Sequence, residues 1–307
     1  MKPSSHHAGG DDPAPRAAPH FLTDVTDLAT RYRAFLLDQW GVLHDGQRPY
    51  PGALKALERL RGSGARILLL SNTAKTEASN VGMLTQMGFA ADLYDGIVTA
   101  GDDARDAVAN DLEAFYRSLG PRCLPLTRPN ERALAQCPSH ALADTVEDAD
   151  WLFLLSMEPP RESIASWYGL LERAAARRLP MVCGNPDLHR ATQDGGLLEA
   201  PGQVAACYAG LGGVVRLHGK PEPRVYRTAL ARLGVERDQV VAVGDSLPHD
   251  GLGAVRAGIA YAWVAGGVHL KEIGYRWGDP AGPDPARCEA LFERYGIRPG
   301  HVLPVWR

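Results

Sequence analysis

The sequence alternates short apolar runs with amphipathic stretches, and the alternation occurs twice, on either side of a segment with a different rhythm. The apolar runs that indicate strands lie at 34–42, 65–72, 96–101, 214–219, 239–245 and 259–267. The stretches that indicate helices lie between them, at 51–64, 77–89, 223–234 and 251–258, with a further helical stretch ending near Ser118. Near-continuous apolar strands separated by helices are typical of a parallel sheet buried on both faces. The pattern therefore predicts an α/β fold in which helices cover a central sheet.

The segment between the two halves has apolar runs of its own. It contains WLFLLSM at 151–157 and a long helical pattern at 163–178, which can form a second small core. Residues 1–20 lack an apolar run, and the last thirty or so residues are rich in Pro, Gly and Arg without clear periodicity. The predicted parts of the chain are a disordered leader at 1–20, a discontinuous core at 21–119 and 191–275, an inserted α/β domain at 120–190, and a C-terminal extension at 276–307.

Charge and cysteine content restrict the partners to be expected. The 307 residues have a formal net charge of −3, which gives no reason to expect nucleic acid or an anionic membrane as a partner. The apolar runs are strand-sized and too short for a transmembrane helix. The five cysteines are scattered and form no C-x-x-C pair, which argues against a structural zinc site and fits a reducing compartment. We therefore expect a cytoplasmic protein that binds a small molecule.

Polar residues of a particular kind follow four of the predicted core strands. They are Asp38, Ser71-Asn72-Thr73, Gly219-Lys220, and Gly244-Asp245 with Asp250 five residues on. The carboxyl ends of parallel strands meet at one edge of a sheet, so these side chains are expected to converge. Carboxylates, a lysine and a hydroxyl suit a hard cation and a phosphoryl group. The pattern predicts Mg²⁺ held by Asp38 and Asp245, with Lys220 and Ser71 binding phosphate oxygens.

These residues and their spacing resemble the haloacid dehalogenase (HAD) superfamily, specifically its class IIA branch of phosphatases with a large α/β cap. The segments that carry the resemblance are DQWGVLHDG at Asp38, LLLSNT at Ser71, HGKPEP at Lys220, and VGDSLPHDGLGA at Asp245 and Asp250. The triplet Asn185-Pro186-Asp187 also resembles a feature at the end of that cap. The resemblance spans residues 33–268 and implies a Rossmann-like, three-layer parallel-sheet core with the inserted domain as its cap.

The resemblance further implies a phosphohydrolase that acts on a small phosphorylated metabolite in two steps. Asp38 would attack phosphorus in line, and water would then hydrolyse the aspartyl-phosphate. The implied metal ligands are Asp38, the Trp40 carbonyl, Asp245 and Asp250; the implied phosphate-binding residues are Gly41, Ser71, Asn72 and Lys220; and the implied catalytic residues are Asp38 and Lys220. Caps of this branch often mediate dimers, so a homodimer formed through the cap is also expected.

Trp40 departs from the family pattern. Most phosphatases of this superfamily carry a second Asp at this position, which protonates the leaving oxygen and later activates water. The indole of Trp40 cannot exchange protons in this role. Losing a positioned acid-base typically costs about 10²–10⁴-fold in rate.

Three hypotheses follow from Trp40. The first is a phosphatase that is restricted to good leaving groups, such as acyl or aryl phosphates, or that uses His44 or Asp45 as a substitute acid. The second is a catalytically weak phosphoester-binding protein with a sensing or scaffolding role. The third is a dehalogenase, which Asp245 and Asp250 argue against because dehalogenases work without the metal. We favour the first.

Two further groups of residues are candidates for contact with the substrate or the metal. Asn185 and Asp187 could face the site from the cap hinge, or could form an Asx-Pro turn between the domains. His44 is a candidate substrate residue, and His249, between Asp245 and Asp250, could tune the metal site. His218, just before Gly219-Lys220, is expected to be a packing residue at the end of a strand.

Overall fold

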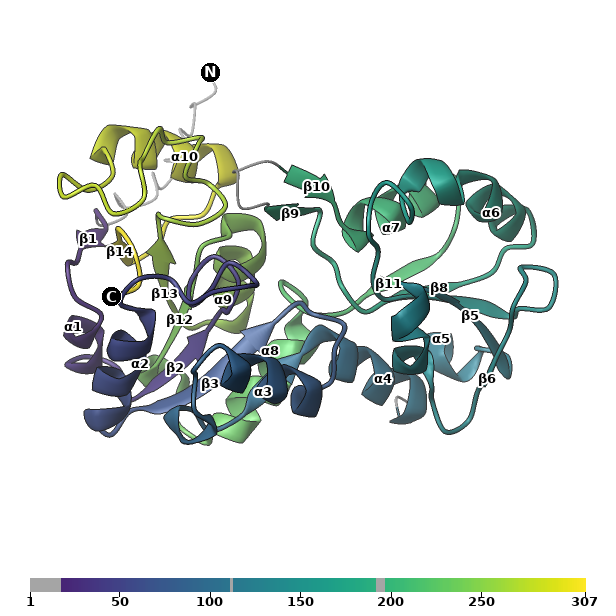
Figure 1. Cartoon of the computed structure of the whole chain (residues 1–307), viewed down its shortest axis with the longest axis horizontal. Coiled ribbons are helices and arrows are strands. Elements are labelled where there is room, and N and C mark those ends of the chain that lie inside the picture. The colour runs from purple at the N-terminus through teal and green to yellow at the C-terminus, as the bar shows by residue number, and fades with distance from the viewer. Residues whose placement is uncertain (1–17, 111–112, 192–196) are drawn as a thin grey trace, which may run out of the picture.

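The larger of two parallel sheets forms the centre of the molecule (Figure 1). The computed structural model describes residues 18–110, 113–191 and 197–307. In spatial order the strands of this sheet are β1 (His20–Phe21), β14 (His301–Leu303), β13 (Ala260–Val264), β12 (Val240–Gly244), β2 (Ala34–Leu37), β3 (Arg66–Ser71) and β4 (Ile97–Thr99). All neighbouring strands pair in parallel. The predicted parallel α/β core is therefore confirmed.

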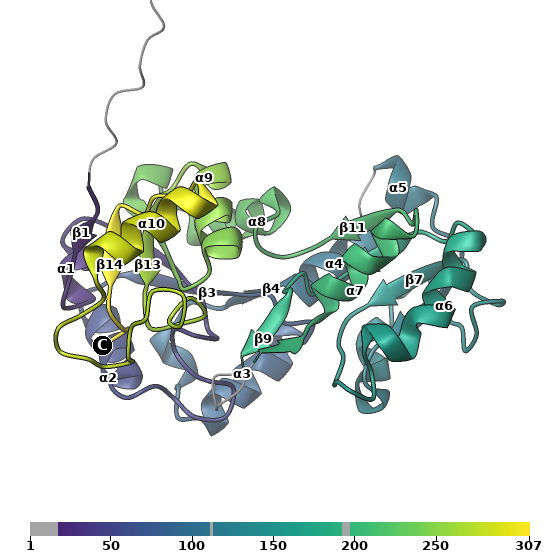
Figure 2. The ribbon, with the colours of Figure 1, turned by 90° about the horizontal axis from the view of Figure 1, so that it is seen from above.

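Helices cover both faces of this sheet and make it the middle of three layers (Figure 2). One face packs against α8 (Pro223–Leu233), α9 (Leu252–Ala257) and α10 (Pro285–Tyr295), and the other against α1 (Thr26–Ala29), α2 (Ala53–Gly62) and α3 (Glu77–Gln86). Successive residues of β2 alternate between the faces, since Ala34 and Leu36 join the first core, and Phe35 and Leu37 join the second. Burying one such Leu or Phe stabilises the fold by about 1.5–3 kcal/mol. This two-sided burial explains why the strands are apolar throughout.

Helix ends follow local capping signals. The side chain of Thr76 accepts a hydrogen bond from the backbone N–H of Ser79 and so begins α3. Helix α8 has Pro223 in its first turn and ends at Gly234, which takes a left-handed conformation with φ of +61°. These elements begin and end within three residues of the predicted positions.

A second, smaller sheet lies beside the first and forms the cap (Figure 1). Its parallel strands, in spatial order, are β11 (Val215–Leu217), β8 (Met181–Cys183), β7 (Trp151–Leu154), β5 (Arg122–Leu126) and β6 (Ala141–Leu142). Helices α6 (Ile164–Ala176) and α7 (Pro201–Gly210) pack against this sheet. The remaining elements are α4 (Ala100–Asn110), α5 (Ala114–Arg117), the antiparallel pair β9 (His189–Ala191) and β10 (Leu197–Glu199), and the short helical turns η1 (Ala91–Leu93), η2 (Pro129–Ala135), η3 (Arg237–Gln239) and η4 (Leu247–Gly251).

The structure corrects the prediction that residues 191–275 belong to the core and 276–307 form an extension. Strand β11, expected in the core sheet, pairs with β8 of the cap, and α7 contributes Val204, Ala205 and Tyr208 to the cap interior. Conversely, β14 joins the core sheet and α10 packs against it. The expected leader also ends earlier than residue 20, because His20 already pairs with His301; residues 1–17 lie outside the described part.

The strand order reverses at β2. From β2 the chain builds β3 and β4 on one side, while β12, β13 and β14 lie on the other. Ligands of open α/β sheets bind at such a reversal of strand order. Across residues 18–110, 113–191 and 197–307, no helix has the length and apolarity needed to cross a membrane.

Candidate active site

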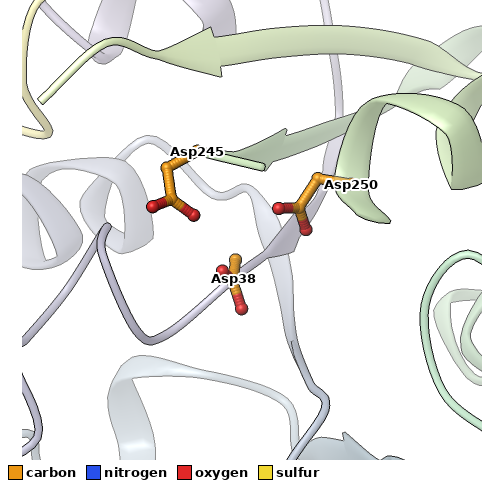
Figure 3. Close-up of side chains that lie close together, drawn as sticks. All are labelled: Asp38, Asp245 and Asp250. Atoms are coloured by element: carbon orange, nitrogen blue, oxygen red, sulfur yellow. The ribbon is translucent and has the colours of Figure 1, made fainter. Parts of the chain in front are cut away.

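Three buried carboxylates meet at this reversal point (Figure 3). Asp38 directly follows β2, and its N–H donates to the carbonyl of Val243 in β12 at 2.9 Å. Asp245 directly follows β12, and Asp250 lies in the turn η4. One oxygen from each carboxylate lies within 4.8 Å of the other two. The predicted convergence of Asp38, Asp245 and Asp250 is therefore present in the fold.

Lys220 enters the same cluster from the cap side of the chain, two residues after His218. Its Nζ lies 2.6 Å from Asp38 Oδ1 and 2.8 Å from Asp250 Oδ1, and all three side chains are buried. The other oxygen of Asp250 accepts a hydrogen bond from the N–H of Ser246 at 3.1 Å. The lysine thus bridges two of the three carboxylates, Asp38 and Asp250.

The cluster carries more negative charge than Lys220 can balance. Burial raises the pKa of Asp38 well above its ordinary value; Asp250 and Asp245 add to the rise, and Lys220 opposes it. Burial and then Asp250 raise the pKa of Asp245 to about 7. Burial alone would lower the pKa of Lys220, but Asp250 and Asp38 outweigh it and raise that pKa. Three ionised carboxylates and one ammonium leave an excess of two negative charges, which a divalent cation would offset.

The surroundings of Asp245 also fit a cation. A Cβ on Gly41, whose φ is +83°, would lie 2.1 Å from Asp245 Oδ2, and a Cβ on Gly267 would lie 2.0 Å from the same oxygen. The N–H of Val268 donates to Asp245 Oδ2 at 2.6 Å and fixes the carboxylate between these glycines. Buried carboxylate oxygens are the ligands that Mg²⁺ prefers in proteins. The residues present therefore fit the predicted magnesium ion.

Ser71 and Asn72 lie at the carboxyl end of β3, the neighbour of β2. Ser71 is buried at this edge, where phosphate binding was predicted for it. The Asn72 side chain is engaged elsewhere: its Oδ1 accepts from the N–H of Lys220 at 2.7 Å, and its Nδ2 donates to the Lys220 carbonyl at 3.2 Å. A Cβ on Gly219 would lie 2.5 Å from Asn72 Oδ1. We therefore infer that Asn72 positions Lys220, instead of binding phosphate through its side chain.

The triplet at 185–187 combines both roles that the sequence left open. Oδ1 of Asn185 accepts from the N–H of Asp187 at 3.1 Å, which forms an Asx turn after β8. Asp187 reaches the core, because its Oδ1 accepts from Nδ2 of Asn72 at 2.7 Å and lies 3.6 Å from His249 Nδ1. The cap hinge therefore contacts two residues that flank the carboxylate cluster.

The loop after Asp38 holds Trp40, His44 and Asp45 in different settings. Trp40 is exposed and packs edge-to-face with the buried His44 ring, at 5.9 Å between centroids. His44 Nδ1 accepts from the N–H of Gly46 at 3.0 Å, and burial lowers the pKa of His44 to about 4. Asp45 Oδ1 accepts from the backbone N–H groups of Gln47 and Arg48. Both candidate substitute acids therefore have structural roles in the loop, and neutral His44 is a poor proton donor near pH 7.

The roles of two relevant residues did not emerge from the sequence. Val268 positions Asp245 through its backbone, which the Gly-Gly pair after β13 could have signalled. His218 is more than a packing residue: its Nδ1 lies 2.7 Å from Asp103 Oδ2, and its Nε2 lies 3.0 Å from the Tyr116 hydroxyl. These two partners come from α4 and α5, so His218 fixes the segment that delivers Lys220 to the site.

Comparison with known proteins agrees with this geometry. The haloacid dehalogenase-like hydrolase family matches residues 35–136, and a HAD-hydrolase-like family matches residues 217–286, which together contain the whole cluster. A structure of a haloacid dehalogenase-like hydrolase from Brucella suis 1330 superimposes with a TM-score of 0.77 at 26% identity, covering 92% of this chain and 99% of that one.

The chain belongs to the haloacid dehalogenase-like hydrolases. Its inserted five-stranded cap, between β4 and Lys220, is that of the class IIA branch. D-glycerol 3-phosphate phosphatase from Mycobacterium tuberculosis is 29% identical over 255 residues, covering 80% of this HAD-like hydrolase and 66% of the relative. A structure of glycerol phosphate phosphatase from the same organism, in complex with calcium, matches with a TM-score of 0.64 at 25% identity, covering 91% of this chain and 73% of that one.

Proposed function

We propose that this HAD-like hydrolase is a magnesium-dependent phosphatase of small phosphorylated metabolites, with Asp38 as its nucleophile. The observation that carries the proposal is the buried Asp38 carboxylate, which lies at the reversal of strand order, 2.6 Å from the Lys220 ammonium. The named activity of the relatives, hydrolysis of glycerol phosphate, supports a small phosphate monoester as substrate.

In the proposed reaction, Oδ of Asp38 attacks phosphorus while the bond from phosphorus to the leaving oxygen breaks. Lys220 and Ser71 bind the phosphoryl oxygens, and the backbone at Gly41 approaches them closely because it carries no side chain. Water then attacks the phosphorus of the aspartyl-phosphate, which releases inorganic phosphate and restores Asp38. Asn72 keeps Lys220 in place during both steps through its hydrogen bond to the Lys220 N–H.

Asp38, Asp245, Asp250 and the Trp40 carbonyl would hold the magnesium ion. When bound, the ion would offset the negative charge of the cluster and of the substrate phosphate. Without the ion, burial and the two neighbouring carboxylates raise the pKa of Asp38. A protonated Asp38 could not attack phosphorus.

A catalytically weak phosphoester-binding protein is the second candidate, because Trp40 offers no proton to a leaving group. In that case Lys220, Ser71 and the cation would still bind the phosphate. Hydrolysis of p-nitrophenyl phosphate, with and without Mg²⁺, distinguishes the two. Magnesium-dependent turnover supports the phosphatase, whereas binding of phosphoesters without turnover supports the binder.

We further propose that the protein works in the cytoplasm, as its scattered free cysteines indicated, and that it forms a homodimer through the cap. The described cysteines form no disulfide, and four of the five are buried. Light scattering of the whole chain and of a variant with a charged residue on the cap surface would test the dimer.

A further inference from the structure

Asp187 is fixed in the cap through both of its backbone polar groups. Its N–H donates to Oδ1 of Asn185 at 3.1 Å, and its carbonyl accepts from the N–H of Gly202 at 2.8 Å. Gly202 lies in the first turn of α7 and packs closely, because a Cβ there would lie 2.2 Å from the Pro186 carbonyl oxygen. The turn after β8 and the beginning of α7 therefore determine where the Asp187 side chain starts.

The carboxylate of Asp187 reaches out of the cap and meets the core at Asn72. Its Oδ1 accepts a hydrogen bond of 2.7 Å from Nδ2 of Asn72, which directly follows β3 and is buried. A hydrogen bond to an ionised acceptor is roughly twice as strong as one between neutral groups. This contact therefore ties the cap turn to the end of a core strand.

Every polar atom of the Asn72 amide has a partner. Oδ1 accepts from the N–H of Lys220 at 2.7 Å, and Nδ2 donates to the Lys220 carbonyl at 3.2 Å and to Asp187 Oδ1 at 2.7 Å. The amide nitrogen has two N–H groups, so both are in use. The amide cannot flip without breaking these bonds. Loss of the Asp187 carboxylate would leave a buried N–H unpaired, which is costly and favours reorientation of the amide.

The Lys220 backbone fits tightly against Asn72. A Cβ on Gly219, whose φ is +94°, would lie 2.5 Å from Asn72 Oδ1 and 2.6 Å from the Cβ of Ala100. From this backbone the Lys220 side chain extends into the cluster, where Nζ lies 2.6 Å from Asp38 Oδ1. A misplacement of about 1 Å in a reacting site can cost about 10²-fold in rate. The position of the lysine backbone therefore matters for the chemistry.

The cap strand that leads to Asp187 also runs beside the segment that leads to Lys220. Strand β8 pairs in parallel with β11, and the two strands lie side by side in Figure 1. The N–H of His218 donates to the carbonyl of Cys183, the last residue of β8, at 2.9 Å. Asp187 and Lys220 thus follow neighbouring cap strands, and the core residue Asn72 hydrogen-bonds to both.

We propose that Asp187 is a positioning residue for Lys220. Its carboxylate orients the Asn72 amide, and Asn72 holds the Lys220 backbone so that the ammonium meets the phosphoryl oxygens. The inference rests on the proposed phosphatase function. Asp187 thereby acts through two other residues and without contact with the substrate, in contrast to the substrate-binding role suggested by the sequence.

Substitution of Asp187 tests this role. Asp187→Ala should lower kcat/KM for p-nitrophenyl phosphate at saturating Mg²⁺ by about 10–100-fold, the usual effect of removing a partner that orients an active-site ligand. It should also weaken the binding of inorganic phosphate, because the ammonium no longer meets the phosphate oxygens. Asp187→Asn keeps an oxygen that can accept from Asn72 and should retain most of the activity. Unchanged turnover and phosphate binding in folded Asp187→Ala would overturn the proposal.

Asp150→Ala is the matched control for these variants. Asp150 is a cap carboxylate of similar exposure that accepts from the N–H of Arg122, also in the cap, so its loss should change neither turnover nor phosphate binding. Asp187→Leu, which also lacks an acceptor, replaces Asp187→Ala if the alanine variant does not fold. A loss of activity in Asp150→Ala equal to that in Asp187→Ala would mean that general damage to the cap, and not positioning, explains the effect.

A double-mutant cycle shows whether Asp187 acts through Asn72. Asn72→Ala should lower kcat/KM at least as much as Asp187→Ala, and the two together should cause no further loss, because both interrupt the same relay. Asp187 also lies 3.6 Å from His249 Nδ1, which offers a separate route to the cluster. Losses that multiply in the double variant would overturn the relay through Asn72.

The natural protein separates this proposal from the proposed function. If it hydrolyses p-nitrophenyl phosphate with Mg²⁺ and Asp187→Ala does so equally well, the phosphatase function stands and the positioning role is wrong. If the natural protein has no turnover, the phosphatase function fails, and calorimetry with inorganic phosphate and Mg²⁺ decides the positioning role. Weaker phosphate binding by Asp187→Ala than by the natural protein supports it. Equal binding, or no binding by the natural protein, overturns it.

Discussion

The ammonium nitrogen of Lys220 lies 2.6 Å from Oδ1 of Asp38, and both side chains are buried. In this position the lysine can lower the cost of ionising Asp38 and can also bind an oxygen of the incoming phosphate. The same nitrogen lies 2.8 Å from Asp250, so one residue balances charge across the cluster. Its removal should therefore affect both folding stability and turnover.

Lys220→Met should reduce the free energy of unfolding in the absence of metal by about 3–5 kcal/mol, because it leaves buried carboxylates without their partner. Added Mg²⁺ should restore part of this loss. Chemical denaturation with and without Mg²⁺ measures both effects. Lys55→Met, at an exposed position of α2, should change stability by no more than about 0.5 kcal/mol. Equal stability of Lys220→Met and the natural protein would refute the ion-pair account.

Gly41→Ala should weaken Mg²⁺ binding by about 10–100-fold, since its Cβ would displace the Asp245 carboxylate. The magnesium-induced rise in melting temperature measures this without any substrate. Gly62→Ala is the matched control, because a Cβ at this position in α2 meets nothing within 4 Å. It should add about 0.5–1 kcal/mol of stability and leave Mg²⁺ binding unchanged. Normal Mg²⁺ binding by Gly41→Ala would mean that Asp245 is not a metal ligand.

The stability of the metal-free protein should depend on pH through Asp245. Its pKa is raised from 3.8 to about 7 in the folded state, so folding favours the protonated form. The stability contributed by this proton is fully present below pH 3.8 and is lost as the pH rises through 7. The slope from this group is at most about 1.4 kcal/mol per pH unit.

Urea denaturation in EDTA between pH 5 and pH 8 measures this slope. Asp245→Asn should remove it, whereas Asp92→Asn, at an exposed position, should not. Added Mg²⁺ should stabilise the natural protein more at pH 8 than at pH 5, because the ion replaces the proton. If the stability of the metal-free natural protein has the same pH dependence as that of Asp245→Asn, the raised pKa of Asp245 is contradicted.

Trp40→Asp should raise kcat/KM for alkyl phosphates by up to about 10²–10⁴-fold, because it supplies a proton donor to the leaving oxygen. Trp40→Asn has a similar size but no acidic proton, and it should show no such gain. Steady-state kinetics with glycerol phosphate compares the two. If both variants gain equally, relief of crowding by the indole, and not proton transfer, explains the change.

Much of the site could be predicted from the sequence because the strands are apolar and end in distinctive residues. Asp38, Ser71 and Asp245 follow long buried runs, and parallel pairing of β2, β3 and β12 brings their ends together. The site of Lys220 was also predicted, although the strand leading to it was assigned to the wrong sheet. Three residues such as Val215–Leu217 carry too little pattern to reveal which sheet they join.

Other parts depended on tertiary contacts that no local pattern encodes. His301–Leu303 is a short strand in a region rich in Pro and Gly, so its pairing with β13 was missed. The hydrogen bond from Asn72 to Asp187 joins residues 115 positions apart. For this reason the sequence predicted phosphate binding by Asn72, whereas in the structure its side chain forms hydrogen bonds with the backbone of Lys220 and with Asp187 in the cap hinge.

The most direct test of the central claim is detection of the phosphoenzyme at Asp38. Acid quenching during turnover of radiolabelled acetyl phosphate with Mg²⁺, followed by proteolysis, locates the covalent label. We predict label on the peptide that contains residue 38 in the natural protein and in the control Asp45→Asn, and neither label nor turnover in Asp38→Asn. Turnover by Asp38→Asn, or label on a different residue, would contradict the assignment of Asp38 as the nucleophile.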